Sequence, residues 1–339
     1  MGSSSKLVCG LLLGLGAGIA YANAKERRRF SFHGRTAIIT GGSRGLGLCM
    51  AREFARQGAR LVLLARNPEE LQRAEVELRA AGASVLCIPC DLRDQAQATA
   101  AIQKAHEHFG SVDVVVNNAG IIEVGPFEHM HVRDFEEAMA IHFYAPLYTT
   151  LAALPYLRES GGGRIVNISS IGGKMAFPHL VAYSASKYAL VGFSDGIRAE
   201  LRQDNIYVTT VCPGFMRTGS VRHAQFKGKH ELEFAWFAAG ATLPLFSMDA
   251  GNAARKIVHA CRHGSPQLLL GIKTKAAVLM NDLFPGATAM LLSAVNRMMP
   301  NSDPTKDGAS HSGAESQPSK MPSWLTRRLD DAAAANNEI

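Results

Sequence analysis

Short apolar runs alternate with longer stretches of helical periodicity from residue 35 to residue 271 of this chain. The runs are rich in Val, Ile and Leu, which indicates buried β-strands, and the stretches between them have the spacing of amphipathic helices. This alternation predicts an α/β fold with a doubly wound parallel sheet. The predicted strands lie near residues 35–40, 60–65, 84–88, 112–116, 164–168, 206–211 and 266–270.

Composition changes at both ends of this region and divides the 339 residues into four parts. Residues 1–29 are an apolar segment with a basic flank, and residues 30–271 are the alternating domain. Residues 272–300 are apolar and helix-prone, and the pattern leaves open whether they rest on the domain, a partner subunit or a membrane. Residues 301–339 predict a disordered linker, rich in Ser, Pro and Gly, followed by a short tail helix.

The N-terminal part contains a possible membrane anchor. Residues 7–24 carry no charge, and as a helix they would span about 27 Å, close to the thickness of a bilayer core. A cleaved secretory signal competes, because residues 20–22 and 22–24 both fit the Ala-X-Ala cleavage pattern. The basic cluster at residues 25–29 favours retention of the downstream chain in the cytosol. We therefore expect an uncleaved anchor with the large domain in the cytosol.

The charge balance points to a membrane surface and away from nucleic acid. The net charge is +7, but residues 25–29 alone supply +3, and no stripe of interleaved basic and aromatic residues is visible. The six cysteines are scattered through apolar segments, as in a reducing compartment. Cys87 and Cys90 form a lone CxxC without a second pair or a histidine cluster, so no metal site is predicted.

A glycine-rich turn at residues 41–47 joins the first strand directly to a helical pattern at residues 48–57. The glycines at 41, 45 and 47 allow a tight turn and let backbone N–H groups approach a pyrophosphate at the helix N-terminus. Two further motifs, at residues 117–120 and 213–214, also follow strands. Ligands bind at the carboxyl edge of such a sheet, so these motifs predict a nucleotide site there.

Tyr183 and Lys187 are four residues apart and would share one face of a helix. A fixed ammonium near a phenol stabilises phenolate, and about 4 kcal/mol of such stabilisation would bring a phenol pKa from 10 toward neutrality. Ser170 ends an apolar strand upstream and could hold a substrate carbonyl. The three residues predict an acid catalyst for a reaction at a carbonyl group.

Together the motifs TGGSRGLG, NNAG, NISS, YSASK and PGFMRT resemble the single-domain form of the short-chain dehydrogenase/reductase family, over about residues 34–270. The resemblance implies a Rossmann-type fold and an oxidoreductase that uses a nicotinamide cofactor. It implies that Tyr183 donates the proton, that Lys187 binds the nicotinamide ribose and lowers the pKa of Tyr183, and that Ser170 orients the carbonyl. It also implies a homo-oligomer, paired through the helices that hold Tyr183 and His142.

The same resemblance assigns further residues to the cofactor. Asn118 would line the cofactor cleft, and Asp91 and Leu92 would contact the adenine. The carboxamide would face Thr218 and the backbone near Phe215, in the loop that begins at Pro213. The residues around the phosphates would be Gly41, Ser43, Arg44, Gly45, Leu46 and Gly47.

His142 departs from the family pattern. The family usually has Asn at this position, where it holds a water that connects the catalytic Lys to solvent. A neutral imidazole can both donate and accept hydrogen bonds, so His142 either takes part in this proton relay or is a hydrogen-bonded core histidine. Both interpretations remain open from the sequence.

The end of the second strand indicates which nicotinamide cofactor is used. An NAD enzyme places a carboxylate there to bind the ribose 2′-hydroxyl, whereas this chain has Ala65 and Arg66. Arg66 and Arg44 could both bind a 2′-phosphate, because guanidinium groups suit bidentate contacts to phosphate oxygens. NADP(H) is therefore the predicted cofactor.

The segment between residues 213 and 249, where the family carries its substrate lid, is rich in Phe, Trp, Met and Leu. We predict carbonyl reduction of a lipophilic ketone or aldehyde. The same side chains would also serve simply to pack lid helices onto the domain. A non-enzymatic alternative is a membrane-tethered Rossmann scaffold or cofactor sensor, for which His142 and the extended tail are the only support.

Overall fold

The computed structural model describes residues 30–243, 247–302, 308–319 and 322–339. Its centre is a seven-stranded sheet in the order β11-β7-β6-β4-β1-β2-β3, with every neighbouring pair parallel. All seven predicted strands are confirmed. They are β1 (Thr36–Thr40), β2 (Arg60–Ala65), β3 (Val85–Pro89), β4 (Val114–Asn117), β6 (Gly163–Ile168), β7 (Ile206–Pro213) and β11 (Gln267–Leu270).

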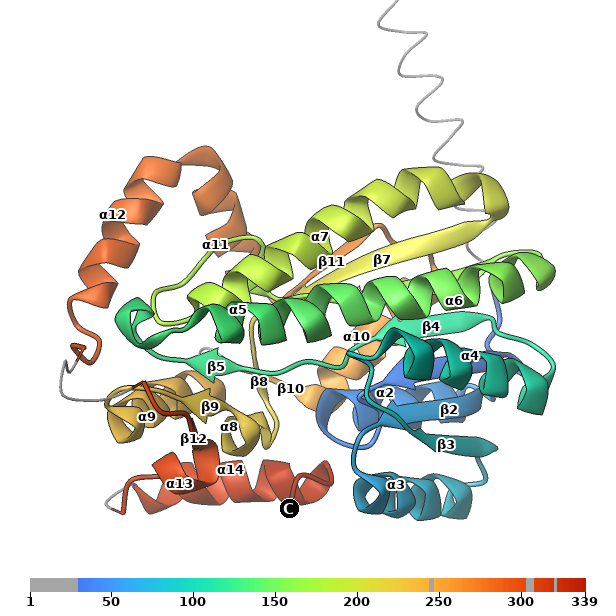
Figure 1. The fold of residues 1–339 in the computed structure, drawn as a ribbon, viewed down its shortest axis with the longest axis horizontal. Coiled ribbons are helices and arrows are strands. Elements are labelled where there is room, and N and C mark those ends of the chain that lie inside the picture. The colour runs from blue at the N-terminus through green and yellow to red at the C-terminus, as the bar shows by residue number, and fades with distance from the viewer. Residues whose placement is uncertain (1–29, 244–246, 303–307, 320–321) are drawn as a thin grey trace, which may run out of the picture.

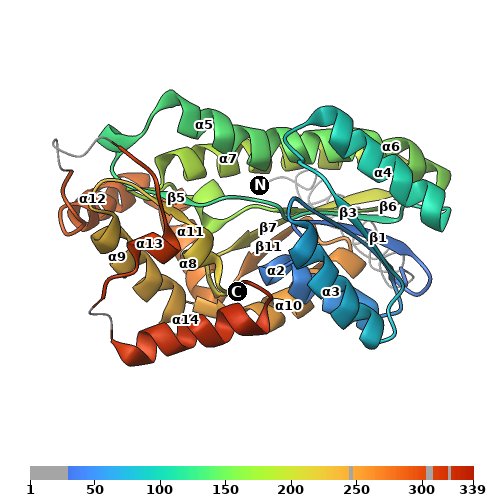
Figure 2. The same ribbon diagram turned by 60° about the horizontal axis from the view of Figure 1, so that its bottom comes forward.

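Helices cover both faces of the sheet, which is why its strands are apolar on both sides (Figure 1, Figure 2). Alternate residues point to opposite layers of helices: Ile39 and Leu63 pack toward the first layer, whereas Ile38 and Val62 pack toward the second. The first layer contains α2 (Gly45–Arg56), α3 (Pro68–Ala80) and α10 (Ala250–Arg262). The second contains α4 (Gln95–Phe109), α5 (Val132–Met139), α6 (Ala145–Glu159) and α7 (Val181–Leu201).

The strand order reverses between β1 and β4. Hydrogen bonds join the C-terminal ends of these two strands. Thr40 Oγ1, at the end of β1, accepts hydrogen bonds from the N–H groups of Asn118 (2.8 Å) and Ala119 (3.0 Å) after β4. The side-chain amide of Asn118 also donates to the Thr40 carbonyl at 3.0 Å. This edge is the topological switch point, where open α/β sheets bind ligands.

A lid of short elements lies over this edge. Phe226 and Phe234 are fully buried in its own small core. The lid strands also form two small sheets, β10-β8 and β12-β9-β5. Its elements are β5 (Glu123–Val124), β8 (Phe215–Arg217), α8 (Ser220–His223), β9 (Gln225–Phe226), α9 (His230–Thr242) and β10 (Ser247–Asp249).

The part of the predicted linker that the structure describes at 308–319 is ordered, which differs from the disorder expected over residues 301–322. Strand β12 (His311–Ser312) pairs antiparallel with β9, and helix α13 (Gly313–Ser316) follows it. A Cβ on Gly313 would lie 2.0 Å from the Val221 carbonyl, so glycine permits this close approach. Ser and Gly here serve a cap and a contact rather than a flexible chain. The expected tail helix is α14 (Ser323–Ala335).

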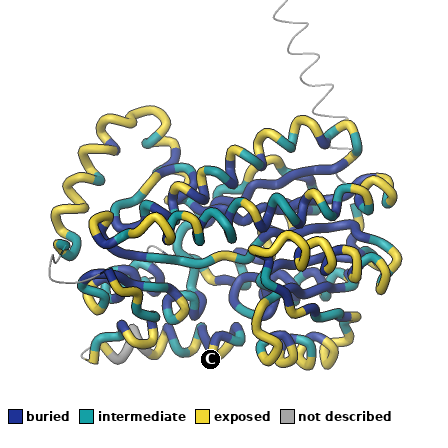
Figure 3. Tube along the Cα trace, viewed as in Figure 1, coloured by how far each residue is buried: buried dark blue, intermediate teal, exposed yellow. Residues whose placement is uncertain are grey.

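Residues 272–300 form two helices, α11 (Ile272–Leu283) and α12 (Pro285–Asn296), which stand away from the domain with many exposed apolar side chains (Figure 3). No single helix within the described residues is long and apolar enough to cross a membrane. Taken together α11 and α12 reach that length and composition, but they are bent by 118°. The anchor predicted at residues 1–29 lies outside the described residues.

Candidate active site

A cleft of about 2310 Å³ opens along the carboxyl ends of the strands, between the sheet and the lid. The predicted site residues come from eight separate segments of the chain, and the fold brings them to this one cleft. Gly47 is the exception and lies behind the turn. The predicted residues that line the cleft are Gly41, Ser43, Arg44, Gly45, Leu46, Arg66, Asp91, Leu92, Asn118, His142, Ser170, Tyr183, Lys187, Pro213, Phe215 and Thr218.

The glycine turn depends on glycine for conformation and for space. Gly41 and Gly45 have φ values of +61° and +57°, in the left-handed region that glycine adopts without strain. A Cβ on Gly47 would lie 2.0 Å from the Gly41 carbonyl oxygen, far inside van der Waals contact. The close packing of Gly47 on Gly41 therefore fixes the turn at the start of α2.

Ser170, Tyr183 and Lys187 meet at the floor of the cleft. Ser170 follows β6, and its hydroxyl accepts a hydrogen bond from the Gly172 N–H at 3.0 Å and interacts with the Tyr183 phenol. Lys187 lies one turn after Tyr183 on α7, with Nζ 5.7 Å from the centre of the Tyr183 ring. Its ammonium donates to the Ile168 carbonyl at 2.9 Å. The predicted grouping of these three side chains is therefore present.

The pKa of Tyr183 is shifted in the direction opposite to the one expected. Burial raises the pKa of this phenol, and the hydrogen bond with Ser170 only partly offsets the increase. Burial also lowers the pKa of Lys187 to about 7, because an ammonium loses its hydration in the protein interior. The Lys187 cation, bound to Ile168, thus does not outweigh the desolvation of Tyr183.

His142 lies in a π-helical turn, Ala140–Tyr144, between α5 and α6, and is 1% exposed. The Ile121 N–H donates to His142 Nε2 at 3.2 Å. Nδ1 then carries the proton and donates to Ser186 Oγ at 2.8 Å, and Ser186 donates to the Tyr183 carbonyl at 2.9 Å. Both ring nitrogens are bound inside the protein, so the structure favours a hydrogen-bonded core histidine that positions the backbone at Tyr183.

The charge state of His142 leads to a prediction for stability. Burial, followed by the nearby Lys187 cation, lowers the pKa of His142 well below 6.5. The unfolded chain therefore binds a proton below pH 6.5 that the folded protein excludes, so stability is lost as the pH decreases below 6.5, by about 1.4 kcal/mol per pH unit. We expect the unfolding free energy of His142→Asn to fall about 2 kcal/mol less than that of the unchanged protein between pH 6.5 and 5. Urea denaturation at each pH measures this, and equal slopes would contradict it.

Arg44 and Glu70 form an ion pair at the adenosine end of the cleft that the sequence did not predict. Arg44 Nη1 lies 2.8 Å from Glu70 Oε1, and Ser43 Oγ donates to Glu70 Oε2 at 2.9 Å. Arg66 is exposed at the rim beside them. The only sequence signal for Glu70 was its place in the first turn of α3, behind the N-cap Asn67.

Asp91 and the two CxxC cysteines lie near the end of β3. Asp91 is bound by Arg93 at 2.6 Å, which lowers the pKa of its carboxyl. Burial raises the pKa of Cys87 to about 12 and that of Cys90 to about 11, so the CxxC thiols stay protonated at neutral pH. Within the described ranges, no group of three or more His, Cys, Asp or Glu side chains could hold a metal ion.

These residues fit a nicotinamide dinucleotide. The glycine positions of the turn have no room for a side chain, since a Cβ on Gly41 would lie 3.0 Å from the Ala119 Cα, so the turn presents backbone to a ligand at these positions. The same cleft is lined both by residues of this turn and by Tyr183. A site that uses a nicotinamide dinucleotide needs a turn that binds its phosphates and a catalytic group in the same cleft.

Comparisons with known proteins agree with this geometry. The profile of a family described as "short chain dehydrogenase" matches residues 35–227. An Anopheles gambiae protein named "Dehydrogenase/reductase SDR family protein 7-like" is 37% identical over 57% of this chain and 63% of its own length. The Bos taurus "3-ketodihydrosphingosine reductase" is 37% identical over 53% of this chain and 56% of its own length. The match therefore covers less than two thirds of the length of each of these two relatives.

Among the solved structures that resemble this chain is one that matches it over almost the whole of the other protein's length. It is L-sorbose reductase from Gluconobacter frateurii complexed with NADPH and L-sorbose. The two chains are 25% identical with a TM-score of 0.64, and the match covers 71% of this chain and 96% of the other.

Proposed function

Because the chain belongs to the short-chain dehydrogenase family, we propose that it is an NADP(H)-dependent oxidoreductase that reduces a lipophilic ketone or aldehyde to an alcohol. The observation that carries the proposal is the meeting of Ser170, Tyr183 and Lys187 in the cleft that also contains the glycine turn. Relatives named as reductases of keto compounds support the direction of the reaction.

The chain's own residues supply the proton and the orientation. Ser170 holds the carbonyl oxygen of the substrate beside the Tyr183 phenol, which donates its proton to that oxygen as negative charge develops there. Lys187 then stabilises the phenolate that remains. The cofactor, when bound, supplies the hydride to the carbonyl carbon. The raised pKa of Tyr183 keeps the phenol protonated until negative charge develops on the carbonyl oxygen.

Cofactor choice rests on the adenosine end of the cleft. The end of β2 carries no carboxylate for a ribose 2′-hydroxyl, and Arg66 is exposed beside it. Arg44 is the second candidate for a 2′-phosphate, since release from Glu70 would let it turn to the cofactor. Both features favour NADP(H).

We expect Arg66→Ala to raise the Kd for NADPH about 10- to 100-fold, because a charge-assisted contact to phosphate contributes about 1.5–3 kcal/mol. The Kd for NADH should remain within a factor of about two, because NADH has no 2′-phosphate. Fluorescence titration measures both constants. Arg56→Ala, which removes an exposed arginine paired with Glu53 on α2, is the control. A parallel loss of NADH binding would argue against a 2′-phosphate contact.

An apolar substrate is supported by the lid and by the mouth of the cleft. The cleft is lined by Phe215, Trp236 and Phe237. The side chains of Phe226 and Phe234 are instead fully buried in the lid core. The sequence allowed two uses for the lid aromatics, and both kinds of position occur, in the lid core and at the cleft wall. The exposed side chains of Val295, in α12, and Met298, just after it, continue this apolar surface at the rim.

A panel of carbonyl substrates tests this part of the proposal. We expect kcat/KM for long-chain or polycyclic ketones and aldehydes to exceed that for small polar ones by at least tenfold, since each buried CH₂ contributes about 0.8 kcal/mol. A preference for small polar carbonyls would contradict the apolar pocket.

The proposal includes a membrane anchor at residues 7–24, with the catalytic domain in the cytosol, where NADPH is available.

We also propose a homodimer. The helices expected to pair subunits expose three large apolar or aromatic side chains, Tyr144 (43% exposed), Leu151 (54%) and Tyr188 (43%), which supports their burial by a partner. Light scattering of the purified protein measures the oligomeric state, and a monomer would contradict this pairing.

A further inference from the structure

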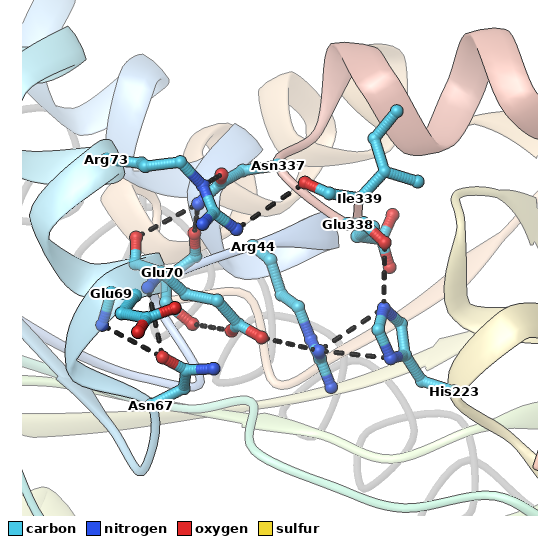
Figure 4. A network of polar contacts seen from close by, with 10 residues as sticks. Arg44, Asn67, Glu69, Glu70, Arg73, His223, Asn337, Glu338 and Ile339 are labelled. Carbon is cyan, nitrogen blue, oxygen red and sulfur yellow. Dashed lines mark hydrogen bonds and ion pairs between the residues drawn. The ribbon is translucent and has the colours of Figure 1, made fainter.

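Residues 336–339, which we call the strap, follow α14 and lie across the mouth of the glycine turn (Figure 4). The Gly45 N–H, at the start of α2, donates to the Asn336 carbonyl at 2.9 Å. The Asn337 side-chain amide donates to the carbonyls of Ser43 (2.8 Å) and Glu70 (3.0 Å). The strap therefore binds directly to the backbone of the phosphate-binding turn.

Glu338 extends from the strap toward the lid. Its carboxylate accepts a hydrogen bond from the Gly219 N–H, in the loop after β8, and it also lies over Gly45. A Cβ on Gly45 would be 3.2 Å from Glu338 Oε1, and the side chain lines the cleft although the residue is only 6% exposed. The Glu338 carbonyl and the His223 ring nitrogen are 3.0 Å apart. This residue thus bridges the glycine turn and the lid with a negative charge.

The docking of the strap is specific. Arg73 on α3 donates to the Asn337 side-chain oxygen at 2.6 Å. Arg52 on α2 donates to the Ala335 carbonyl at 3.0 Å, and the Cys49 thiol donates to the Asn336 side-chain oxygen at 3.0 Å. Upstream, Leu329 and Ala333 of α14 are buried. Contacts from two helices and the lid therefore hold the segment in one place.

We propose that the strap is an autoinhibitory gate on the cofactor end of the cleft. It occupies N–H groups at the turn and the lid loop, and it places the Glu338 carboxylate where the phosphates of a dinucleotide would bring negative charge. Strap and dinucleotide cannot both hold this position, so binding of the cofactor displaces the strap. The inference goes beyond carbonyl reduction, since it requires only that a nicotinamide dinucleotide binds at the turn.

The environment of Glu338 suits a displaceable contact. Burial raises the pKa of this carboxyl to about 7, because a carboxylate loses hydration between the turn and the lid. The Arg44 guanidinium opposes this increase and the Glu70 carboxylate adds to it. Many hydrogen bonds hold the strap in place. Burial of the Glu338 carboxylate is unfavourable, however, and release of the strap would return this group to water.

The experiment compares the full chain with Glu338→Ala and Arg73→Ala. Glu338→Ala removes the competing charge, and Arg73→Ala releases the strap from α3 without altering the turn. Arg79→Ala is the matched control, because Arg79 is also an exposed arginine of α3, paired with Glu75 and remote from the strap. Fluorescence titration gives the Kd for NADPH and NADH, and amide hydrogen exchange follows residues 336–339 with and without NADPH.

We expect both strap variants to bind both dinucleotides about tenfold more tightly than the unchanged chain, with Arg79→Ala unchanged. NADPH should increase amide exchange in residues 336–339. Unchanged or weaker binding in the strap variants, protection of the strap by NADPH, or absence of dinucleotide binding in every variant would each overturn the gate. Tighter binding without reduction of any carbonyl would uphold the gate and reject the proposed function.

Discussion

Replacement of Tyr183 by Phe is expected to reduce kcat for carbonyl reduction by at least about a thousandfold, because the variant has no proton to donate to the carbonyl oxygen. The Phe ring keeps the shape of the partly buried side chain, so the fold and the cofactor turn should be retained. The Kd for NADPH should change by less than about threefold, since the substitution leaves every residue of the glycine turn in place. Stopped-flow oxidation of NADPH gives kcat, and fluorescence titration gives the Kd.

Ser170→Ala is the companion variant, with an expected loss of about 100-fold, because it removes one hydrogen bond to the developing oxyanion and leaves the acid in place. Retention of turnover in Tyr183→Phe would contradict the assigned acid. If cells carrying this variant also kept the protein's biological role, the scaffold or cofactor sensor would become the better account.

Gly47→Ala is expected to have the second large effect. The added Cβ would lie 2.0 Å from the Gly41 carbonyl oxygen, which is backbone and cannot rotate away, so the turn must open. We expect the Kd for NADPH to rise at least about 100-fold. We also expect the unfolding free energy to fall by about 1–3 kcal/mol, the usual cost of overpacking a close contact.

The matched control is Gly286→Ala in α12, where an added Cβ meets nothing within 4 Å. There the same substitution should stabilise the helix by about 0.5–1 kcal/mol and leave NADPH binding unchanged. Urea denaturation and NADPH titration separate the two sites. Normal NADPH binding by Gly47→Ala would show that the turn does not need this close packing.

The strands and the catalytic grouping were predictable because their signals are local. A parallel strand buried on both faces appears as a short apolar run, and Tyr183 and Lys187 share a helix face through their spacing alone. Placement of the glycine turn, Asn118 and Ser170 in one cleft followed from a general rule about the carboxyl edge of such sheets.

Features that depend on tertiary surroundings were not predictable. The direction of the Tyr183 pKa shift is set by burial under the lid, which no spacing reveals. His142 was found at its position, but its partners Ile121 and Ser186 were not. The order of residues 308–319 arises from pairing with β9 far back in the chain, and Glu338 meets Gly45 across almost the whole sequence. Composition alone therefore indicated disorder where long-range contacts produce order.

The most direct test of the central claim is hydride transfer by the purified full chain. NADPH carrying deuterium at both C4 positions of the nicotinamide would be incubated with a panel of long-chain and polycyclic ketones and aldehydes, and the products examined by mass spectrometry. The account predicts an alcohol with one deuterium at the former carbonyl carbon, formed with NADPH in preference to NADH and abolished by Tyr183→Phe. Tight binding of NADPH with no deuterium transferred to any carbonyl would contradict it.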